Sequence, residues 1–486
     1  MKDKAYFLEK AEENMPLLHE RTVRPQISQI CVNKGDSFVL DLGGHCVGRF
    51  SFRLDNADDF MSAPAKLTIR FGEDMREIND DFSSYHGTLS EAWLQEEVLI
   101  LDHPQTVNMP RRYSCRYIRI TVNSVRRPTL LFDFCFIAST SADQSKLVAA
   151  QTSDPLLQRI DKTAADTLRE CMQTFFEDGP KRDRRLWIGD MRLEALTNYY
   201  TFDNREIVKR CLYLFAAGEC SSLGFLPSFV YETPYFFSGR TNIADYALLY
   251  VVSVCDYFEH TGDRDTVGDL IELCKAQIDS FENILNDRLI VTPQEGWFSF
   301  IDWCPELCGL TALQGVYLYA LDHFTRLLKA IGDCDLEKYH DLLGRVRIAS
   351  KQHLFDEKTG LFVNELDGGQ ISVHAQVWMI LGGTIEGKEA ANALRCAMNL
   401  KDAKKPGTPY MWHYVIDAFI KLGLKDEAVA CIKRIWGGML ERGADTFYEV
   451  YVPGDPDFSP YNDRMVNSLC HAWSCTPAYF IRKYGL

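Results

Sequence analysis

The chain has 486 residues, of which 46% are hydrophobic and 25% charged, so it can bury a large core and has room for two or three domains. Its net charge of −15 disfavours a nucleic acid or an anionic membrane as a partner held by general electrostatics. No run of 18 apolar residues occurs, so we expect no membrane span. This composition fits a protein that acts on a neutral small molecule.

The first segment, MKDKAYFLEKAEENMPLLHE, is charged throughout and lacks both an apolar central region and a small-residue cleavage site. It is therefore not expected to be a signal peptide, and a cytoplasmic location is predicted. The 16 cysteines are scattered, with no CxxC pair. Without an export signal, we interpret them as reduced thiols packed in the core.

Residues 25–140 carry the period-two pattern of β-strands. SFVLDLGGHCVGRFSFRL alternates on both sides of a Gly-Gly pair that we interpret as a turn. AKLTIRFGED, EEVLILD and YSCRYIRITV show the same alternation with β-branched and aromatic residues. Strands of this length, separated by short turn clusters, predict an antiparallel β-sandwich as a first domain over residues 1–145.

After Thr140 the hydrophobic period changes to that of helices, as LTALQGVYLYALDHFTRLLKAIG shows best. Twelve helices are predicted, over 153–173, 190–203, 205–217, 243–261, 265–286, 309–331, 335–354, 373–383, 387–399, 408–422, 425–438 and 466–483. Twelve helices make six hairpins. We therefore predict that residues 146–486 form an (α/α)6 toroid barrel, with an irregular bundle as the alternative.

Three segments between these helices are long, aromatic and acidic: EDGPKRDRRLWIGD, GFLPSFVYETPYFFSGRTNIAD and GADTFYEVYVPGDPDFSPYND. A shorter fourth segment is EGWFSFIDWCPE. Loops of this length and composition more often carry function than simply connect elements. At one rim of a helical toroid they would converge on its central cavity. Aromatic rings among carboxylates are typical of a sugar site, because rings stack on sugar C–H faces while carboxylates bind hydroxyl groups.

A glycosidase needs two carboxyl groups across the scissile bond, one to protonate the leaving oxygen and one to activate water or attack the sugar. Such chemistry needs no metal and no cofactor. The acids in the four segments that could serve are Asp178, Asp183, Asp190, Asp245, Asp302 and Glu449.

Several of these segments resemble motifs of glycoside hydrolase family 78, the α-L-rhamnosidases. DGPKRDRRLWIGDMR is similar to the family's acidic signature, D-C-P-Q-R-D-E-R-L-G-W-T-G-D. FIDW resembles its G-D-W segment, GADTFYE its G-A-T-T-x-W-E segment, and NSLCHAWSCTPAYFI its closing helix. The resemblance covers nearly the whole chain and implies a sandwich followed by an (α/α)6 barrel.

The resemblance also implies roles. Glu449 matches the family's general base, which deprotonates water in a single inverting step. The implied substrate is a small glycoside with a terminal deoxyhexose such as α-L-rhamnose. The resemblance places substrate contacts at Asp178, Arg182, Trp187, Asp190, Asp245, Asp302, Trp303 and His471.

One departure concerns the general acid. The family's acid is the Glu of R-D-E-R, whereas this chain has Arg184 there and is one residue shorter. Arginine cannot donate a proton near neutral pH, so Asp183 is the predicted acid. Its pKa would have to be raised by burial or by a neighbouring carboxylate, and the surrounding arginines would oppose that.

Other interpretations stay open. Asp183 could form a structural ion pair with an arginine, and Asp190 could cap the following helix. The scaffold also supports a lyase, in which arginines bind a uronate and a Tyr or His acts as base. Without a replacement acid, the chain would be a non-catalytic sugar-binding protein.

Overall fold

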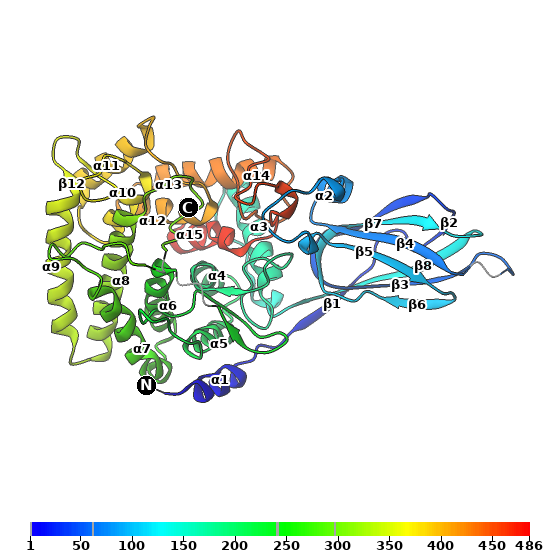
Figure 1. The fold of residues 1–486 in the computed structure, drawn as a ribbon, viewed down its shortest axis with the longest axis horizontal. Coiled ribbons are helices and arrows are strands. Elements are labelled where there is room, and N and C mark those ends of the chain that lie inside the picture. The colour runs from blue at the N-terminus through cyan, green and yellow to red at the C-terminus, as the bar shows by residue number, and fades with distance from the viewer. Residues whose placement is uncertain (1, 61–62, 240–242, 296–297) are drawn as a thin grey trace.

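The computed structural model describes residues 2–60, 63–239, 243–295 and 298–486. Figure 1 shows a sheet domain at one end of the molecule and a larger helical domain at the other. Residues 14–18 and 141–154 connect the two domains.

The sheet domain is antiparallel throughout its described pairings. Its order is β1-β8-β3-β7-β4-β5, with β2 also on β8 and β6 on β3. Alternate residues of the long strands face the interior, where Leu40, Phe50, Ile69, Ile118 and Phe136 are buried. The predicted sandwich is confirmed. Its strands are β1 (His19–Val23), β2 (Gln29–Val32), β3 (Ser37–Asn56), β4 (Ala65–Gly72), β5 (Glu96–Leu101), β6 (Gln105–Asn108), β7 (Tyr113–Ser124) and β8 (Thr129–Thr140).

The predicted turn at Gly43-Gly44 was wrong. Strand β3 runs through both glycines, and its register shifts between Asp41 and Cys46. Gly43 has a φ of +81°, which inserts a bulge and bends the strand without reversing it. The first half of β3 pairs with β7 and the second half with β8.

The helical domain is a closed ring of inner helices surrounded by outer ones. The inner helices are buried around most of their circumference. They are α4 (Ile188–Tyr200), α6 (Ala244–Thr261), α8 (Leu310–Ile331), α10 (Val373–Leu381) and α12 (Pro409–Lys421). Helix α15 (Pro477–Tyr484), with the short η6 (Ala472–Cys475) before it, closes the ring between α12 and α4.

Most of the outer helices bury one stripe each, as amphipathic surface helices do. They are α3 (Pro155–Cys171), α5 (Arg205–Ala216), α7 (Arg264–Glu282), α9 (Leu336–Leu354), α11 (Gly387–Asn399) and α13 (Lys425–Ile432). Helix α13 continues through a π-helical turn, η4 (Lys433–Gly437), into α14 (Gly438–Glu441). The predicted (α/α)6 barrel is confirmed.

Every predicted helix except the last coincides with an observed one. The segment 466–483 was predicted to be one helix, but after Val466, which ends a short 3-10 turn, only η6 and α15 are helical there. Pro477 provides no amide hydrogen for a helix that starts earlier. In addition, the amides of Ser468 and Leu469 donate to Glu449 and Glu73 instead of to helix carbonyls. His471 therefore lies in extended backbone before η6 rather than inside a helix.

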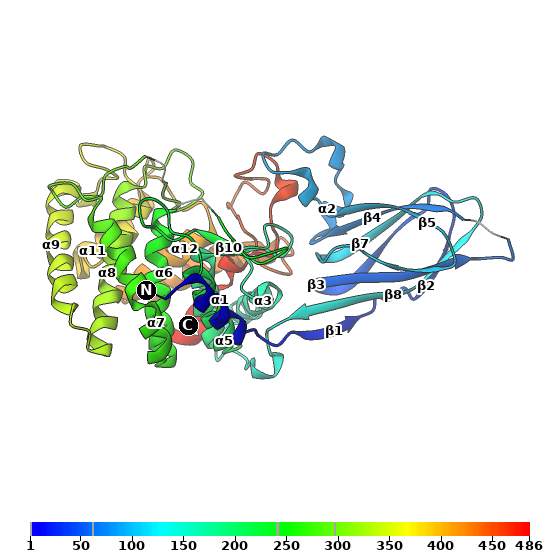
Figure 2. The ribbon, with the colours of Figure 1, turned by 60° about the horizontal axis from the view of Figure 1, so that its bottom comes forward.

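The chain starts on the helical domain before it enters the sandwich. Helix α1 (Lys4–Glu13) packs against α5, as Figure 2 shows, and the Tyr6 hydroxyl donates to Asp269 of α7 at 2.7 Å. The sequence division had grouped this helix with the sandwich, in residues 1–145. In space it belongs to the outer surface of the barrel.

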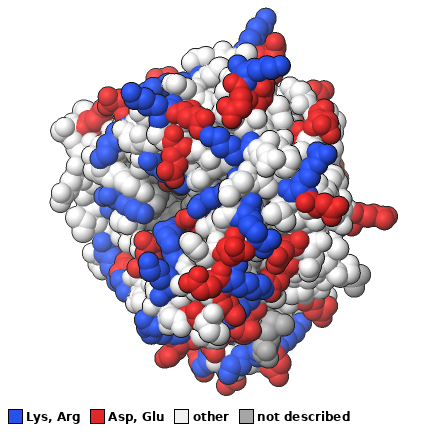
Figure 3. Space-filling view, turned by 90° about the vertical axis from the view of Figure 1, so that its left-hand side faces the viewer, with Lys and Arg blue, Asp and Glu red and all other residues white. Residues whose placement is uncertain are grey.

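The barrel end that carries α9 has both signs of charge interspersed, as Figure 3 shows. Neighbouring charges pair there, for example Arg345 with Asp341 and Lys351 with Glu389.

None of the helices in the described ranges combines the length and apolar character that crossing a bilayer requires. All 16 cysteines are free thiols, and nine of them are buried.

Candidate active site

The four acidic and aromatic segments converge on one cavity of about 290 Å³ at the rim where α4 and α6 begin. The N-terminal ends of these helices face the cavity, and their partial positive charge favours carboxylates there. The cavity is lined by Leu89, Asp178, Arg182, Asp183, Arg185, Trp187, Asp190, Ile243, Tyr246, Phe298, Phe300, Trp303, Glu449, Tyr461, His471 and Trp473.

The segment 177–190 is a tight loop that leads into α4. The amide of Arg185 donates to Asp178 Oδ1 at 3.0 Å, and the amide of Asp178 donates back to the Arg185 carbonyl at 3.0 Å. These bonds close the loop and turn Asp178, Arg182 and Asp183 toward the cavity. Trp187 is the N-cap of α4 and Asp190 its third residue, so the alternative of Asp190 as the cap was wrong.

Glu449 is the best-held carboxylate of the cavity. The guanidinium of Arg182 and the hydroxyl of Tyr461 donate to it, and the amide of Ser468 donates to Oε2 at 3.2 Å. Burial alone would raise the pKa of Glu449, but the charges of Arg182 and His471 and the hydrogen bonds from Arg182 and Tyr461 together outweigh it and lower the pKa to about 2. Glu449 is therefore ionised near neutral pH, as a general base must be.

Asp178 and Asp190 are buried carboxyl groups whose pKa values are raised, in contrast to the lowered pKa of Glu449. Burial, together with the charges of Asp183 and Asp190, raises the pKa of Asp178 well above its usual range. Burial also raises the pKa of Asp190, which the contact of its Oδ1 with His471 Nε2 at 3.1 Å opposes. The cavity thus holds a carboxyl group whose surroundings favour its protonated form, Asp178, together with one that stays ionised, Glu449, as acid–base chemistry requires.

Asp183 is the more exposed carboxyl of this group, with 19% of its side chain accessible. Arg182 Nη1 lies 3.2 Å and Arg185 Nη1 3.9 Å from its oxygens. The ion pair weighed as its alternative role is therefore present. Its exposure nevertheless leaves the carboxyl in reach of a bound ligand.

Arg184, which occupies the family's acid position, does not point into the cavity. Its guanidinium donates to the carbonyls of Pro180 at 2.8 Å and Arg112 at 2.9 Å. Its backbone has a φ of +59°, which turns the side chain toward the sandwich domain. Arg184 therefore links the two domains and leaves the acid role to a cavity carboxyl.

Aromatic rings form much of the cavity wall. Trp187 packs on Phe229 at 4.5 Å between ring centroids, and Trp303 packs edge-on against Phe300 at 5.2 Å and Tyr461 at 5.9 Å. Both tryptophans are half-buried, so part of each ring is accessible from the cavity. These are the surfaces on which a sugar ring would stack.

The structure does not bring Asp245 and Asp302 into the cavity wall. Asp245 accepts the amides of Phe300 at 2.8 Å and Ile301 at 3.1 Å. Asp302 accepts from Gly407, Thr408 and His374 at 2.6 to 2.8 Å. Both carboxylates lie behind the wall, where they anchor the loop that carries Trp303.

Several lining residues were not predicted individually. Tyr461 contacts Glu449 directly, and Trp473 Nε1 donates to the Glu449 carbonyl at 2.9 Å. Both lie in segments that the sequence had marked, but no spacing rule distinguishes them from their neighbours. Leu89 comes from the sandwich domain, and only tertiary structure reveals that this domain reaches the cavity.

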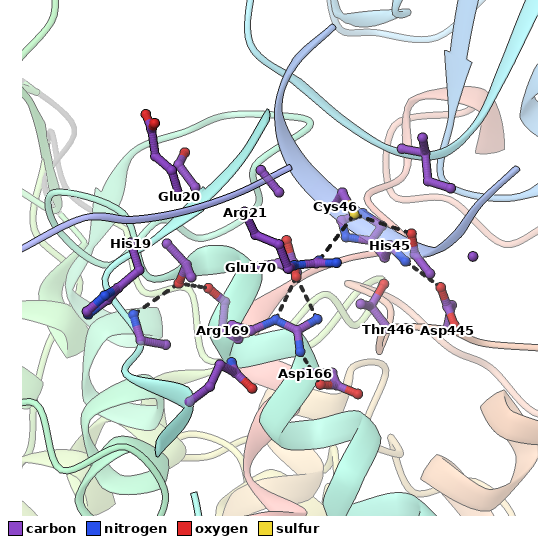
Figure 4. Close-up of a pocket in the computed structure, with 18 of the residues that line it drawn as sticks. His19, Glu20, Arg21, His45, Cys46, Asp166, Arg169, Glu170, Asp445 and Thr446 are labelled. Carbon is purple, nitrogen blue, oxygen red and sulfur yellow. Dashed lines mark hydrogen bonds and ion pairs between the residues drawn. The ribbon is translucent and has the colours of Figure 1, made fainter. Parts of the chain in front are cut away.

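A second cavity, of about 590 Å³, lies between the two domains (Figure 4). Arg169 crosses it and pairs with Asp166 and Glu170. It offers no Trp, Tyr or Phe ring among its described lining residues, so it lacks the stacking surfaces of a sugar site.

A closely spaced set of potential metal ligands occurs far from the catalytic cavity in the sequence, at Asp333, Cys334 and Asp335. The ammonium of Lys275 pairs with both aspartates, at 3.0 and 2.7 Å. This cation already neutralises the two carboxylates.

Sequence models of two domain families match the chain. The glycosyl hydrolase family 78 alpha-rhamnosidase N-terminal domain matches residues 14–135, and the bacterial alpha-L-rhamnosidase six-hairpin glycosidase domain matches residues 146–484. A comparison with curated proteins gave no match.

Solved structures agree. A rhamnosidase from Klebsiella oxytoca with rhamnose bound is 36% identical, with a TM-score of 0.95 over 100% of this chain and 99% of that one. A family 78 rhamnosidase of Bacillus sp. GL1 is 24% identical, with a TM-score of 0.78 over 92% of this chain and 46% of that one. The latter likeness supports the fold alone. Matched over both domains, the chain is a glycosidase and belongs to glycoside hydrolase family 78.

Proposed function

We propose that this glycosidase is an inverting α-L-rhamnosidase that releases terminal α-L-rhamnose from small glycosides. The observation that carries the proposal is the presence, in one aromatic cavity, of the ionised Glu449, of Asp178, whose surroundings favour its protonated form, and of its neighbour Asp183. The rhamnose in the Klebsiella oxytoca structure supports the choice of sugar.

In this proposal Glu449 is the general base. It accepts a proton from a water molecule, whose oxygen bonds to the anomeric carbon on the face opposite the leaving group. Arg182, Tyr461 and Ser468 hold the carboxylate in one orientation. Because its pKa is about 2, Glu449 is always ready to accept the proton, although it is a weak base.

Asp183 is the proposed general acid. The charge of Asp183 is the largest of the charges that raise the pKa of Asp178, so Asp178 can hold a proton beside Asp183. Burial favours Asp178 as its resting position, and the more exposed Asp183 delivers it to the leaving oxygen as the bond from that oxygen to the anomeric carbon breaks. In this division of roles Asp183 does not have to hold the proton between turnovers, which the neighbouring arginines would oppose.

The leaving group is proposed to extend into a neighbouring cavity of about 540 Å³, which shares Phe298, Phe300 and Trp303 with the sugar cavity. Phe458, Pro305 and Pro460 add apolar surface there. Asp302 is the charged residue among its described lining residues, but the side chain is fully buried and its carboxylate accepts hydrogen bonds from His374, Gly407 and Thr408. A small, uncharged leaving group suits this surface.

The test is hydrolysis of an aryl and an alkyl α-L-rhamnoside by the wild type, Glu449→Gln, Asp183→Asn and Asp178→Asn, with Asp341→Asn on α9 as control. Glu449→Gln should lose about 10²–10⁴-fold in kcat on both substrates. Asp183→Asn should lose far more on the alkyl glycoside, because an aryl leaving group needs little protonation. A wild type that hydrolyses neither substrate would overturn the proposal.

A further inference from the structure

The backbone segment 465–469, which we call the base-facing segment, lies directly against the proposed base. The Ser468 amide donates to Glu449 Oε2 at 3.2 Å, and the Glu449 amide donates to the Ser468 carbonyl at 3.0 Å. Arg182 Nε, whose guanidinium also pairs with Glu449, donates to the Val466 carbonyl at 3.0 Å. The position of this segment therefore fixes the position of the Glu449 carboxylate.

The other side of the base-facing segment is held by the sandwich domain. The Leu469 amide donates to Glu73 Oε2 at 2.6 Å. The ammonium of Lys181 donates to the carbonyls of Asn467 at 2.8 Å and Met465 at 3.2 Å, and it pairs with Glu77. Glu73 follows β4, and Glu77 lies in α2 (Met75–Asn79). Figures 1 and 2 both place α2 beside the loop that precedes α15.

These contacts are buried and charged, so they are sensitive to the loss of one partner. Glu73, Glu77 and Lys181 are 4%, 6% and 2% exposed. The Glu73 backbone amide donates to Glu77 Oε2 at 2.7 Å, which ties the Glu77 carboxylate to the backbone of Glu73. A buried ammonium that loses its carboxylate partner must move toward water or lose its proton. Because Lys181 directly precedes Arg182, such a move would disturb the ion pair of Glu449.

A second contact from the same domain holds Tyr461, which donates to Glu449. The Thr88 amide donates to the Tyr461 carbonyl at 2.9 Å, and the His86 amide donates to Asp463 at 3.1 Å. On the other side of the interface, the His45 amide donates to Asp445 Oδ2 at 2.6 Å, beside the cavity of Figure 4. The sandwich thus holds the loop that carries Glu449 at several points.

We infer that Glu77 of the sandwich domain is a positioning residue for Glu449, acting through Lys181 and the base-facing segment. The inference rests on the proposed role of Glu449 as base. It gives the sandwich domain a part in positioning the base.

The test compares Glu77→Gln with Glu97→Gln, a matched control in which the glutamate pairs with Arg111 and Tyr113 inside the sandwich. Glu77→Gln should lower kcat at least about tenfold and change KM far less. The loss in kcat should be the same on aryl and alkyl rhamnosides, because the base serves both. In a Glu449→Gln background the same substitution should cost nothing further, since the two residues act as one unit. Glu77→Asp, which keeps the charge, should retain more activity than Glu77→Gln.

A lower melting temperature with unchanged kcat would overturn the inference, because that is what a purely structural ion pair predicts. Hydrogen exchange followed by mass spectrometry provides a readout that does not depend on turnover. Residues 465–469 should exchange faster in Glu77→Gln than in the wild type or Glu97→Gln. Unchanged exchange there would also overturn it, whereas an inactive wild type with faster exchange would overturn the proposed function and leave the positioning role standing.

Discussion

The guanidinium of Arg182 and the carboxylate of Glu449 form an ion pair with both side chains nearly excluded from solvent, at 3% and 2% exposure. Arg182 belongs to the acidic signature after α3, and Glu449 to the loop after α14, so the pair joins two distant parts of the chain. It keeps the proposed base ionised in surroundings that would otherwise favour its protonation.

Arg182→Gln is expected to move the acid limb of the kcat/KM profile to higher pH. The ion pair is the main cause that lowers the pKa of Glu449 to about 2, so the ionised form is present above that value and is lost as pH falls through it. Without the cation, burial raises this pKa, and the limb should rise by about two pH units or more. Arg345→Gln on α9 serves as the control, and an unmoved limb in Arg182→Gln would contradict this account of Glu449.

Asp178→Asn is expected to change the basic limb. The raised pKa of Asp178 means that its proton is held through the lower pH range and lost as pH rises through that pKa. Activity on an alkyl rhamnoside should therefore fall on the basic side in the wild type, and this limb should move or vanish in Asp178→Asn. A basic limb identical in the two proteins would show that Asp178 does not store the catalytic proton.

Asp302→Ala is expected to weaken substrate binding although Asp302 lies behind the cavity wall. The substitution leaves Gly407, Thr408 and His374 without their carboxylate partner, at a cost of about 1–3 kcal/mol in stability. It also loosens the loop that carries Trp303. We expect KM to rise more than kcat falls, whereas Asp287→Ala, at an exposed position, should change neither constant.

Two glycine-to-alanine substitutions test the packing of the barrel. A Cβ added at Gly315 of α8 would lie 2.5 Å from the Trp378 backbone of α10, whereas one at Gly344 of α9 meets nothing within 4 Å. Gly315→Ala should therefore destabilise the protein by about 1–3 kcal/mol. Gly344→Ala should stabilise it by about 0.5–1 kcal/mol, through the better helix propensity of alanine. Thermal unfolding of both variants checks the pair, and equal melting temperatures would contradict the close approach of α8 and α10.

The barrel was predictable because helical periodicity is a local property. Helix α8 spans Leu310–Ile331 against a prediction of 309–331. The prediction of the last helix was wrong because the amides of Ser468 and Leu469 donate to distant carboxylates, which no local pattern encodes. The prediction of a turn at Gly43 failed for a related reason. A glycine pair can reverse a strand or only bend it, and the pairing with neighbouring strands decides which.

The site was predictable in its segments and less so in its details. Each of the marked segments around Asp183, Trp303 and Glu449 reaches the cavity, because functional loops combine rings and carboxylates in a recognisable way. The positions of Asp245 and Asp302 behind the wall, and the contact of Tyr461 with the base, depend on side-chain directions that only the folded chain fixes.

The most direct measurement is proton NMR of the sugar in the first minutes of hydrolysis of p-nitrophenyl α-L-rhamnoside by the wild type, before the anomers equilibrate. Attack of a water molecule activated by Glu449, opposite a leaving group protonated by Asp183, predicts that β-L-rhamnose forms first and the α-anomer appears later. Initial formation of α-L-rhamnose would mean retention through a covalent intermediate and would contradict the assignment of Glu449 as general base.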